Sequence, residues 1–82
     1  MKIDWFEIWK EDRESMLNTM VRNMASDLEN GYSYYGNSMI RQRAEIDRFK
    51  ADYDADMDKL AEMEPNKVQH WCHMRLIKLG AI

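Results

Sequence analysis

The sequence predicts an all-α protein of three helices, in which a long antiparallel helical hairpin carries a short C-terminal helix. Three observations predict this fold class. Apolar residues recur at intervals of three, four and seven over two long stretches, which is the spacing of amphipathic helices. Glycines bracket the segment between these stretches, and the single proline, Pro65, precedes a third apolar stretch. No run of alternating apolar and polar residues indicates a strand.

The first helix is expected over residues 4–30. Asp4 and Glu7 have the N-cap and N3 spacing of a capping box. Its apolar stripe consists of Trp5, Trp9, Met16, Met20, Met24 and Leu28, with Leu17 and Val21 beside it. Asn30-Gly31 is a C-cap signal, because glycine adopts the left-handed turn without penalty.

Residues 10–15 interrupt this stripe, since none of them is apolar. We expect one continuous helix that leaves the core there. The alternative is a break, with the Trp5-Phe6-Trp9 turn folding separately.

The second helix is expected over residues 38–63, after a loop of residues 31–37 and with Asn37 or Ser38 as its N-cap. The residues that fall seven apart are Met39, Ile46, Tyr53 and Leu60, with Phe49, Met57 and Met63 beside them. This is a seam of coiled-coil type. Two helices of about 25 residues each span close to 40 Å at 1.5 Å per residue. The short loop between them favours an antiparallel hairpin.

The third helix is expected over residues 65–79, with Pro65 in its first turn. Its apolar residues leave little polar face: Val68, Trp71, Cys72, Met74, Leu76, Ile77 and Leu79. Such a helix lies across the hairpin or is buried between protomers. Its cations (Lys67, Arg75 and Lys78) favour a position near the acidic half of the second helix. We expect one domain, residues 1–82, and a homodimer formed through apolar seam surface.

Composition excludes several classes of protein. The formal net charge of −3 is a poor match to general nucleic-acid binding. The single cysteine, Cys72, excludes an internal disulfide and fits a reducing compartment. We expect no signal peptide, because Asp4 lies within the first residues and no long apolar run follows. No stretch reaches the roughly 20 apolar residues of a membrane span, so we expect a cytoplasmic protein without a membrane partner.

The most distinctive segment is the acidic run Asp52–Glu64, which falls in the second half of the second helix. A helix is stabilised by anions at its N-terminus and cations at its C-terminus, and this helix is charged the other way round. A partner surface is therefore the candidate reason for these charges. The candidate partner-binding residues are Asp52, Asp54, Asp56, Asp58 and Glu62. The simpler interpretation is a solvated face, and the functional one is a negative surface that imitates a phosphate backbone or docks on an Arg/Lys cleft.

The alternating aspartates resemble a calcium-binding loop but do not fit one. Met57 stands where that loop needs glycine, and Met63 stands where it needs a bidentate acid. His70, Cys72 and His73 suggest zinc, but Cys72 points away from His70 on a helix and a second ligand pair is missing from the sequence. We expect no metal and no cofactor.

The sequence also predicts no enzyme activity. Cys72 and His73 are adjacent, and adjacent side chains on a helix diverge, so they do not form a nucleophile–base pair. No fingerprint of a hydrolase, a P-loop or a dinucleotide-binding site appears in the sequence.

Two further groups of residues are candidates for binding a partner. The aromatic candidates are Trp5, Trp9, Tyr32, Tyr34 and Tyr35, because one thin core cannot cover all aromatic rings of the first turn and exposed aromatics are typical hot spots. The candidate phosphate contacts are Arg41, Arg43, Arg48 and Lys50, diluted by neighbouring acids.

The C-terminal segment Trp71–Ile82, with its Trp-Cys pair, basic helix and final Gly-Ala-Ile, resembles the tails of short phage and prophage proteins of Gram-positive bacteria. The size and the acid-rich helical make-up also resemble some anti-CRISPR proteins. No diagnostic motif is shared, so no residue roles are carried over.

The resemblance implies a stoichiometric inhibitor that binds a host nucleic-acid enzyme, such as a CRISPR effector nuclease, through the acidic face. The alternatives are a small nucleic-acid-binding regulator that uses the basic residues, and a structural or assembly protein of a phage.

Overall fold

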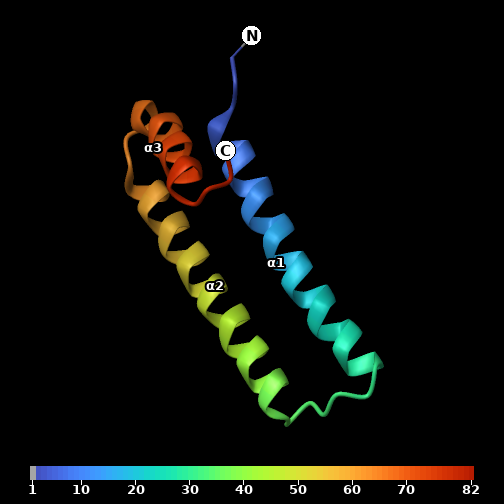
Figure 1. Cartoon of the computed structure of the whole chain (residues 1–82). Helices are drawn as coiled ribbons and strands as arrows, with labels where there is room; N and C mark the ends of the chain where they lie inside the picture. The colour runs from blue at the N-terminus through green and yellow to red at the C-terminus, as the bar shows by residue number, and fades with distance from the viewer. Residues whose placement is uncertain (1) are drawn as a thin grey trace.

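The computed structural model describes residues 2–82 and confirms the all-α fold class. Helix α1 spans Trp5–Glu29, α2 spans Asn37–Glu62 and α3 spans Pro65–Lys78. The first two helices form an elongated antiparallel hairpin, and α3 packs against α1 at the end opposite the connecting loop (Figure 1). The molecule measures 48 × 26 × 17 Å, so most of each long helix has solvent on several sides. No helix in the described part of the chain is long and apolar enough to cross a membrane.

Helix α1 begins with Asp4 as its N-cap, which is the first half of the predicted capping box. The Asp4 carboxylate accepts a hydrogen bond from the backbone amide of Glu7 (3.1 Å). Gln69 of α3 completes this cap, because its amide donates to the Asp4 carboxylate (3.0 Å) and its carbonyl accepts from the Trp5 amide (2.7 Å). The hydrogen bonds from Gln69 and then from Glu7 lower the pKa of Asp4. The helix continues unbroken through residues 10–15, as predicted.

The loop between α1 and α2 begins as predicted and ends differently. Gly31 has a φ of +94°, and the amides that follow α1 donate to its last carbonyls, including Tyr32 to Asp27 at 3.1 Å. The predicted N-cap of α2 was wrong: Asn37 is already helical and Gly36 is the N-cap, with no side chain bonded to the helix end. The Ser38 hydroxyl instead accepts a hydrogen bond from the Gln42 amide (3.2 Å).

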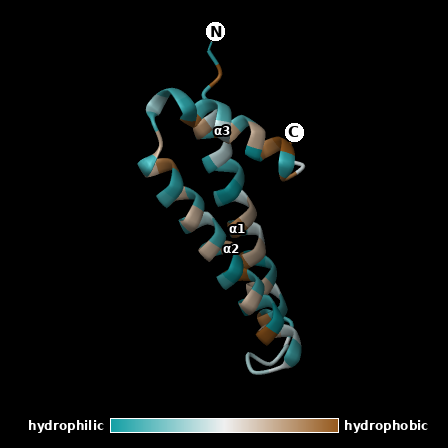
Figure 2. Cartoon of the chain, turned by 90° about the vertical axis from the view of Figure 1, so that its left-hand side faces the viewer, coloured by the Kyte–Doolittle hydropathy of each residue, from teal (hydrophilic) through white to brown (hydrophobic). Residues whose placement is uncertain are grey.

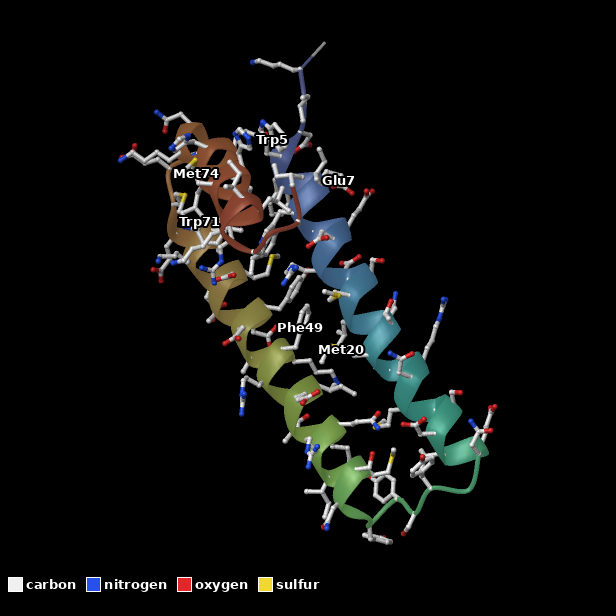
Figure 3. All side chains as sticks on the ribbon, viewed as in Figure 1. Trp5, Glu7, Met20, Phe49, Trp71 and Met74 are labelled. Atoms are coloured by element: carbon white, nitrogen blue, oxygen red, sulfur yellow. The ribbon has the colours of Figure 1, made fainter. Side chains whose placement is uncertain are left out.

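The main core lies where the three helices meet. Its fully or almost fully buried side chains are Trp9, Leu60, Cys72 and Leu76, and half-buried neighbours surround them: Trp5, Phe6, Tyr53, Met57, Met63, Val68 and Trp71. Aromatic rings enclose Trp9, with Tyr53 stacked parallel at 5.5 Å and Trp71 edge-on at 6.1 Å. Trp71 and Trp5 both lie at this end of the molecule (Figure 3).

The rest of the hairpin has a thinner core. The predicted heptad seam of α2 is confirmed, since Met39 and Ile46 are buried on it between the loop and the main core. Phe49 and Met20 lie between α1 and α2 (Figure 3). Met16 was expected in the buried stripe of α1. It does not belong to that stripe, because half of its surface is exposed.

Helix α3 lies across the hairpin end, near the acidic half of α2, as its basic residues predicted. Arg75 forms an ion pair with Asp56 of α2 (3.2 Å). The outer side of α3 is not covered by any part of residues 2–82, since Met74 and Ile77 are about half exposed. Of the two predicted arrangements, the described residues show α3 lying across the hairpin.

Candidate functional site

The acidic residues of α2 divide into an exposed row and two residues that lie apart from it. At roughly 100° per residue, Asp47, Asp54, Asp58 and Glu62 fall within about 80° of each other on the outer side of the helix. All four are exposed, and we call them the acidic row. Hydrophilic residues dominate this half of α2 in Figure 2. The sequence analysis missed Asp47, although its spacing of seven from Asp54 was the signal.

Small side chains separate the members of the acidic row. The exposed residues between and beside them are Ala44, Ala51, Ala55 and Ala61. A methyl side chain does not hold a neighbouring surface away from the helix, so a partner can approach the backbone of α2 closely along this side.

No carboxylate of the acidic row forms an ion pair with another residue in the range 2–82. The ion pairs within residues 2–82 are Arg13–Asp12, Lys67–Glu64 and Arg75–Asp56. None of them includes a carboxylate of the row. Its charge is therefore available to a partner.

Asp56 is not a candidate for binding a partner. Its side chain is only 14% exposed and accepts hydrogen bonds from Arg75 Nε (3.2 Å) and Nη2 (3.3 Å). Neither a solvated face nor a partner-binding surface describes Asp56, because it lies on the side of α2 that faces α3. Its role is to hold two helices together.

Asp52 is exposed but points away from the acidic row, about 120° from Asp58 at 100° per residue. It borders a small depression between the helices that also includes Arg13, Phe49, Tyr53 and Asp56. A single flat partner surface cannot contact Asp52 and the acidic row together.

The aromatic candidates separate into two groups at opposite ends of the hairpin. Trp9 is fully buried and cannot bind a partner, which corrects the prediction for that residue. Trp5 is half-buried and stacks on His73, with ring centroids 3.9 Å apart. The exposed aromatic residues of the loop are Tyr32 (55%), Tyr34 (45%) and Tyr35 (80%).

The four basic candidates do not form one cluster. At 100° per residue, Arg41 and Arg48 share one flank of α2, while Arg43 and Lys50 share another. The Arg43 guanidinium lies over the Tyr34 ring at 4.1 Å and donates to the Tyr34 carbonyl (3.3 Å). Arg43 is therefore packed against the loop between α1 and α2.

The cysteine and histidines lie in three different environments. Cys72 is fully buried, and burial raises the pKa of its thiol from 9.0 to about 11, followed by smaller effects of Asp4 and Asp56. His70 is exposed and His73 is stacked on Trp5. Within residues 2–82, no three His, Cys, Asp or Glu side chains are placed to share a metal ion.

An apolar groove that sequence reasoning did not find runs along the outer side of α3. It is lined by Met63, Asn66, Lys67, His70, Trp71 and Met74. The signal in the sequence was that residues 68–79 are apolar on nearly every side of the helix. The hairpin covers only one side of α3, so Met74 is left without a helix to cover it.

The fold and the exposed residues define a class: an all-α three-helix protein whose polar features lie on an open helix surface. No protein-family model matches the chain, and no curated protein or solved structure matches it either.

Proposed function

We propose that this chain is a non-enzymatic interaction protein that binds the Arg/Lys-lined cleft of a host nucleic-acid enzyme and inhibits it stoichiometrically. A CRISPR effector nuclease is the target we propose. In this proposal the chain is phage-encoded and acts in the cytoplasm of the host cell.

The acidic row carries the proposal. Asp54, Asp58 and Glu62 are each four residues apart, so their charges repeat about every 6 Å along the axis at 1.5 Å per residue. A regular line of negative charge on a stiff rod is the property of a nucleic-acid strand that basic clefts recognise without reading sequence. The absence of counterions within residues 2–82 supports this use of the row.

The charge order of α2 supports the same conclusion. Anions near a helix C-terminus cost about 0.3–1 kcal/mol each, and the acidic row runs into the last turn of α2 at Glu62. Binding to a basic cleft would offset this cost, since cations of the partner neutralise the acids. Electrostatic complementarity of this kind mainly accelerates association and is weakened by salt.

The test is a DNA-cleavage assay with a purified, guide-loaded Cas9-type effector. The variant carries Asp54→Lys, Asp58→Lys and Glu62→Lys, and we expect inhibition to weaken at least tenfold while circular dichroism stays helical. The matched control carries Glu11→Lys, Glu29→Lys and Glu45→Lys, which changes the net charge equally at exposed positions outside the row.

Equal inhibition by both triple variants would exclude the acidic row as the binding surface. A wild-type chain that neither binds the effector in calorimetry nor slows cleavage would exclude the target. These two results separate the surface from the identity of its partner.

We also propose that the free chain forms a homodimer through the partly exposed residues Met24 and Leu28 of α1, with the exposed Val21 beside them. Sedimentation equilibrium should then report about twice the 9.9 kDa of one chain. A single-chain mass across the whole concentration range would contradict the dimer.

A further inference from the structure

The loop end of the hairpin carries a second surface, made of aromatic rings and guanidinium groups. Its members are Tyr32, Tyr34, Tyr35, Arg41 and Arg43, and we call it the tyrosine tip. It lies at the opposite end of the molecule from α3 (Figure 1).

Two rings of the tyrosine tip, Tyr34 and Tyr35, pack against neighbouring groups, and all three rings remain open to solvent. Tyr34 and Tyr35 pack edge to face with centroids 5.2 Å apart, and the Arg43 guanidinium covers one side of Tyr34 at 4.1 Å. Tyr35 is nevertheless 80% exposed and Tyr32 55% exposed. Core residues are not this exposed. Exposed aromatic rings that are already ordered before binding are good binding platforms.

The loop and the first turns of α2 carry cations and no acids of their own, while Asp27, Glu29 and Glu45 lie at the edges of the tip. No acidic residue occurs between Glu29 and Glu45, whereas Arg41 and Arg43 fall in that interval. Helix α2 also begins here without a side-chain cap or an acid in its first turn, and its first hydrogen bond runs from the Ile40 amide to the Gly36 carbonyl (3.0 Å). The positive end of α2 adds to the guanidinium charge, and the negative end of α1 lies at the same end of the hairpin.

Three of the four acids of the acidic row (Asp54, Asp58 and Glu62) are too distant to cancel this charge, whereas Asp47 lies one turn from Arg43. Arg41 and Asp54 are 13 residues apart on α2, which is about 20 Å at 1.5 Å per residue. The screening length is about 10 Å at 0.1 M salt, so the two ends of α2 present separate electrostatic surfaces.

We propose that the tyrosine tip binds an unpaired nucleic-acid strand, with bases stacked on Tyr32 and Tyr35 and phosphates at Arg41 and Arg43. Open aromatic faces beside guanidinium groups are the combination that single-strand binding uses, because every base has a π-face and every phosphate a charge. Arg48 lies two turns from Arg41 on the same flank of α2, so a bound strand can continue along that flank. This surface is separate from the acidic row and does not depend on its function.

The test is fluorescence anisotropy of labelled oligo(dT) and oligo(U) strands of about 20 nucleotides, longer than the roughly 4–16 nucleotides that one small binding surface covers. We expect both strands to bind at low salt, and a duplex of the same length to bind more weakly because its bases are already stacked. Two contacted phosphates predict a slope of about −1.4 for log affinity against log salt on single strands.

Variants identify the residues responsible. Tyr32→Ala with Tyr35→Ala should weaken binding at least tenfold, since one stacked base contributes about 1–3 kcal/mol, or roughly 5- to 150-fold in affinity. Tyr32→Phe with Tyr35→Phe keeps the rings and should bind like the wild type. Arg41→Ala should lower the salt slope.

Two controls complete the experiment. Asp54→Asn with Asp58→Asn should leave strand affinity unchanged or slightly higher, because these residues lie outside the tip. Tyr35→Ala alone, at the most exposed ring, provides a variant that cannot disturb the core.

Three results would overturn the proposal. They are the absence of any anisotropy rise with either strand, equal affinity of the alanine and wild-type proteins, and a preference for duplex over single strand. The first of these would leave a protein surface as the ligand of the tip. None of them bears on nuclease inhibition by the acidic row, so the two functions fail or succeed separately.

Discussion

The guanidinium of Arg75 holds the carboxylate of Asp56 with hydrogen bonds of 3.2 and 3.3 Å, and this contact joins α3 to α2. Both side chains are mostly shielded from solvent, at 29% and 14% exposed. The Arg75 guanidinium also lies 5.6 Å from the Trp71 ring. The pair therefore fixes the position of α3 over the aromatic core, although α3 packs mainly against α1.

Replacing Asp56 by alanine should lower the free energy of unfolding by about 1–2 kcal/mol, because Arg75 loses its partner in a partly desolvated site. Urea denaturation followed by circular dichroism measures this change. Arg75→Ala and the double variant complete a cycle, and we expect a coupling energy of about 1 kcal/mol between two residues in contact.

Asp58→Ala is the matched control for this pair. Asp58 lies on the same helix but is exposed and has no ion-pair partner within residues 2–82. Its replacement should change stability by less than about 0.5 kcal/mol. An Asp56→Ala effect as small as that of Asp58→Ala would show that the ion pair does not hold α3 in place.

Trp9 is the side chain on which the core depends most. It is fully buried between Tyr53, Phe6 and Trp71. Trp9→Ala should cost about 3–5 kcal/mol, and a chain of this size has only about 4–12 kcal/mol at 0.05–0.15 kcal/mol per residue. Loss of cooperative thermal unfolding is the expected result.

Trp9→Phe distinguishes ring packing from the indole N–H. The Trp9 Nε1 group is buried and has no hydrogen-bond partner in the described part of the chain, so phenylalanine removes an unsatisfied donor along with part of the volume. We therefore expect Trp9→Phe to be clearly less destabilising than Trp9→Ala in urea denaturation. Equal losses would contradict this expectation, because a phenyl ring at position 9 would then restore none of the packing that alanine removes.

The helices could be predicted from the sequence because their signals are local. The capping aspartate Asp4, the glycine Gly31 and the heptad seam each act within a few residues, and each was found where expected. The N-cap of α2 was missed because Asn37 and Ser38 are good capping residues by type. The chain instead turns at Gly36 and uses the Ser38 hydroxyl for Gln42.

The candidate site was predicted less well, because it depends on which side of a helix faces another helix. Asp56 and Asp58 are equivalent by composition, and only the position of α3 makes one structural and leaves the other exposed. Trp5 and Trp9 are one turn apart, and only the packing of Tyr53 and Trp71 shows which ring is enclosed. Helical spacing alone could have indicated Asp47 as a fourth member of the acidic row.

Replacing Gly31 by any residue with a Cβ should lower the free energy of unfolding. Its φ of +94° disfavours residues with a Cβ, although nothing lies within 4 Å of the position a Cβ would take. The cost of Gly31→Ala is therefore purely a backbone cost, about 1–2 kcal/mol, and thermal unfolding should measure it. Gly31→Asn should cost less, because asparagine adopts this region more readily. Equal stability of all three proteins would show that the turn rearranges.

The buried thiol of Cys72 should make the folded protein less stable at alkaline pH. Burial raises the pKa of its thiol from 9.0 to about 11 in the folded chain, so the folded state keeps a proton that the unfolded state releases. The stability linked to this thiol is fully present below about pH 9 and is lost as the pH rises towards about 11. The pKa of Tyr53 is also raised, by burial and by Glu14, and its titration adds to the same loss at the upper end of this range.

Urea denaturation of the wild type and of Cys72→Ala between pH 7 and about pH 11 tests this linkage. The alanine variant is less stable at neutral pH because a buried side chain becomes smaller, but the difference between the two proteins should shrink as the pH rises from about 9 to 11.

A buried thiol should also react with a disulfide reagent at pH 8 only after urea is added, since the thiolate is the reactive form. Rapid labelling of the native chain, or a difference that stays constant with pH, would show that Cys72 is open to solvent and that the three helices do not enclose it.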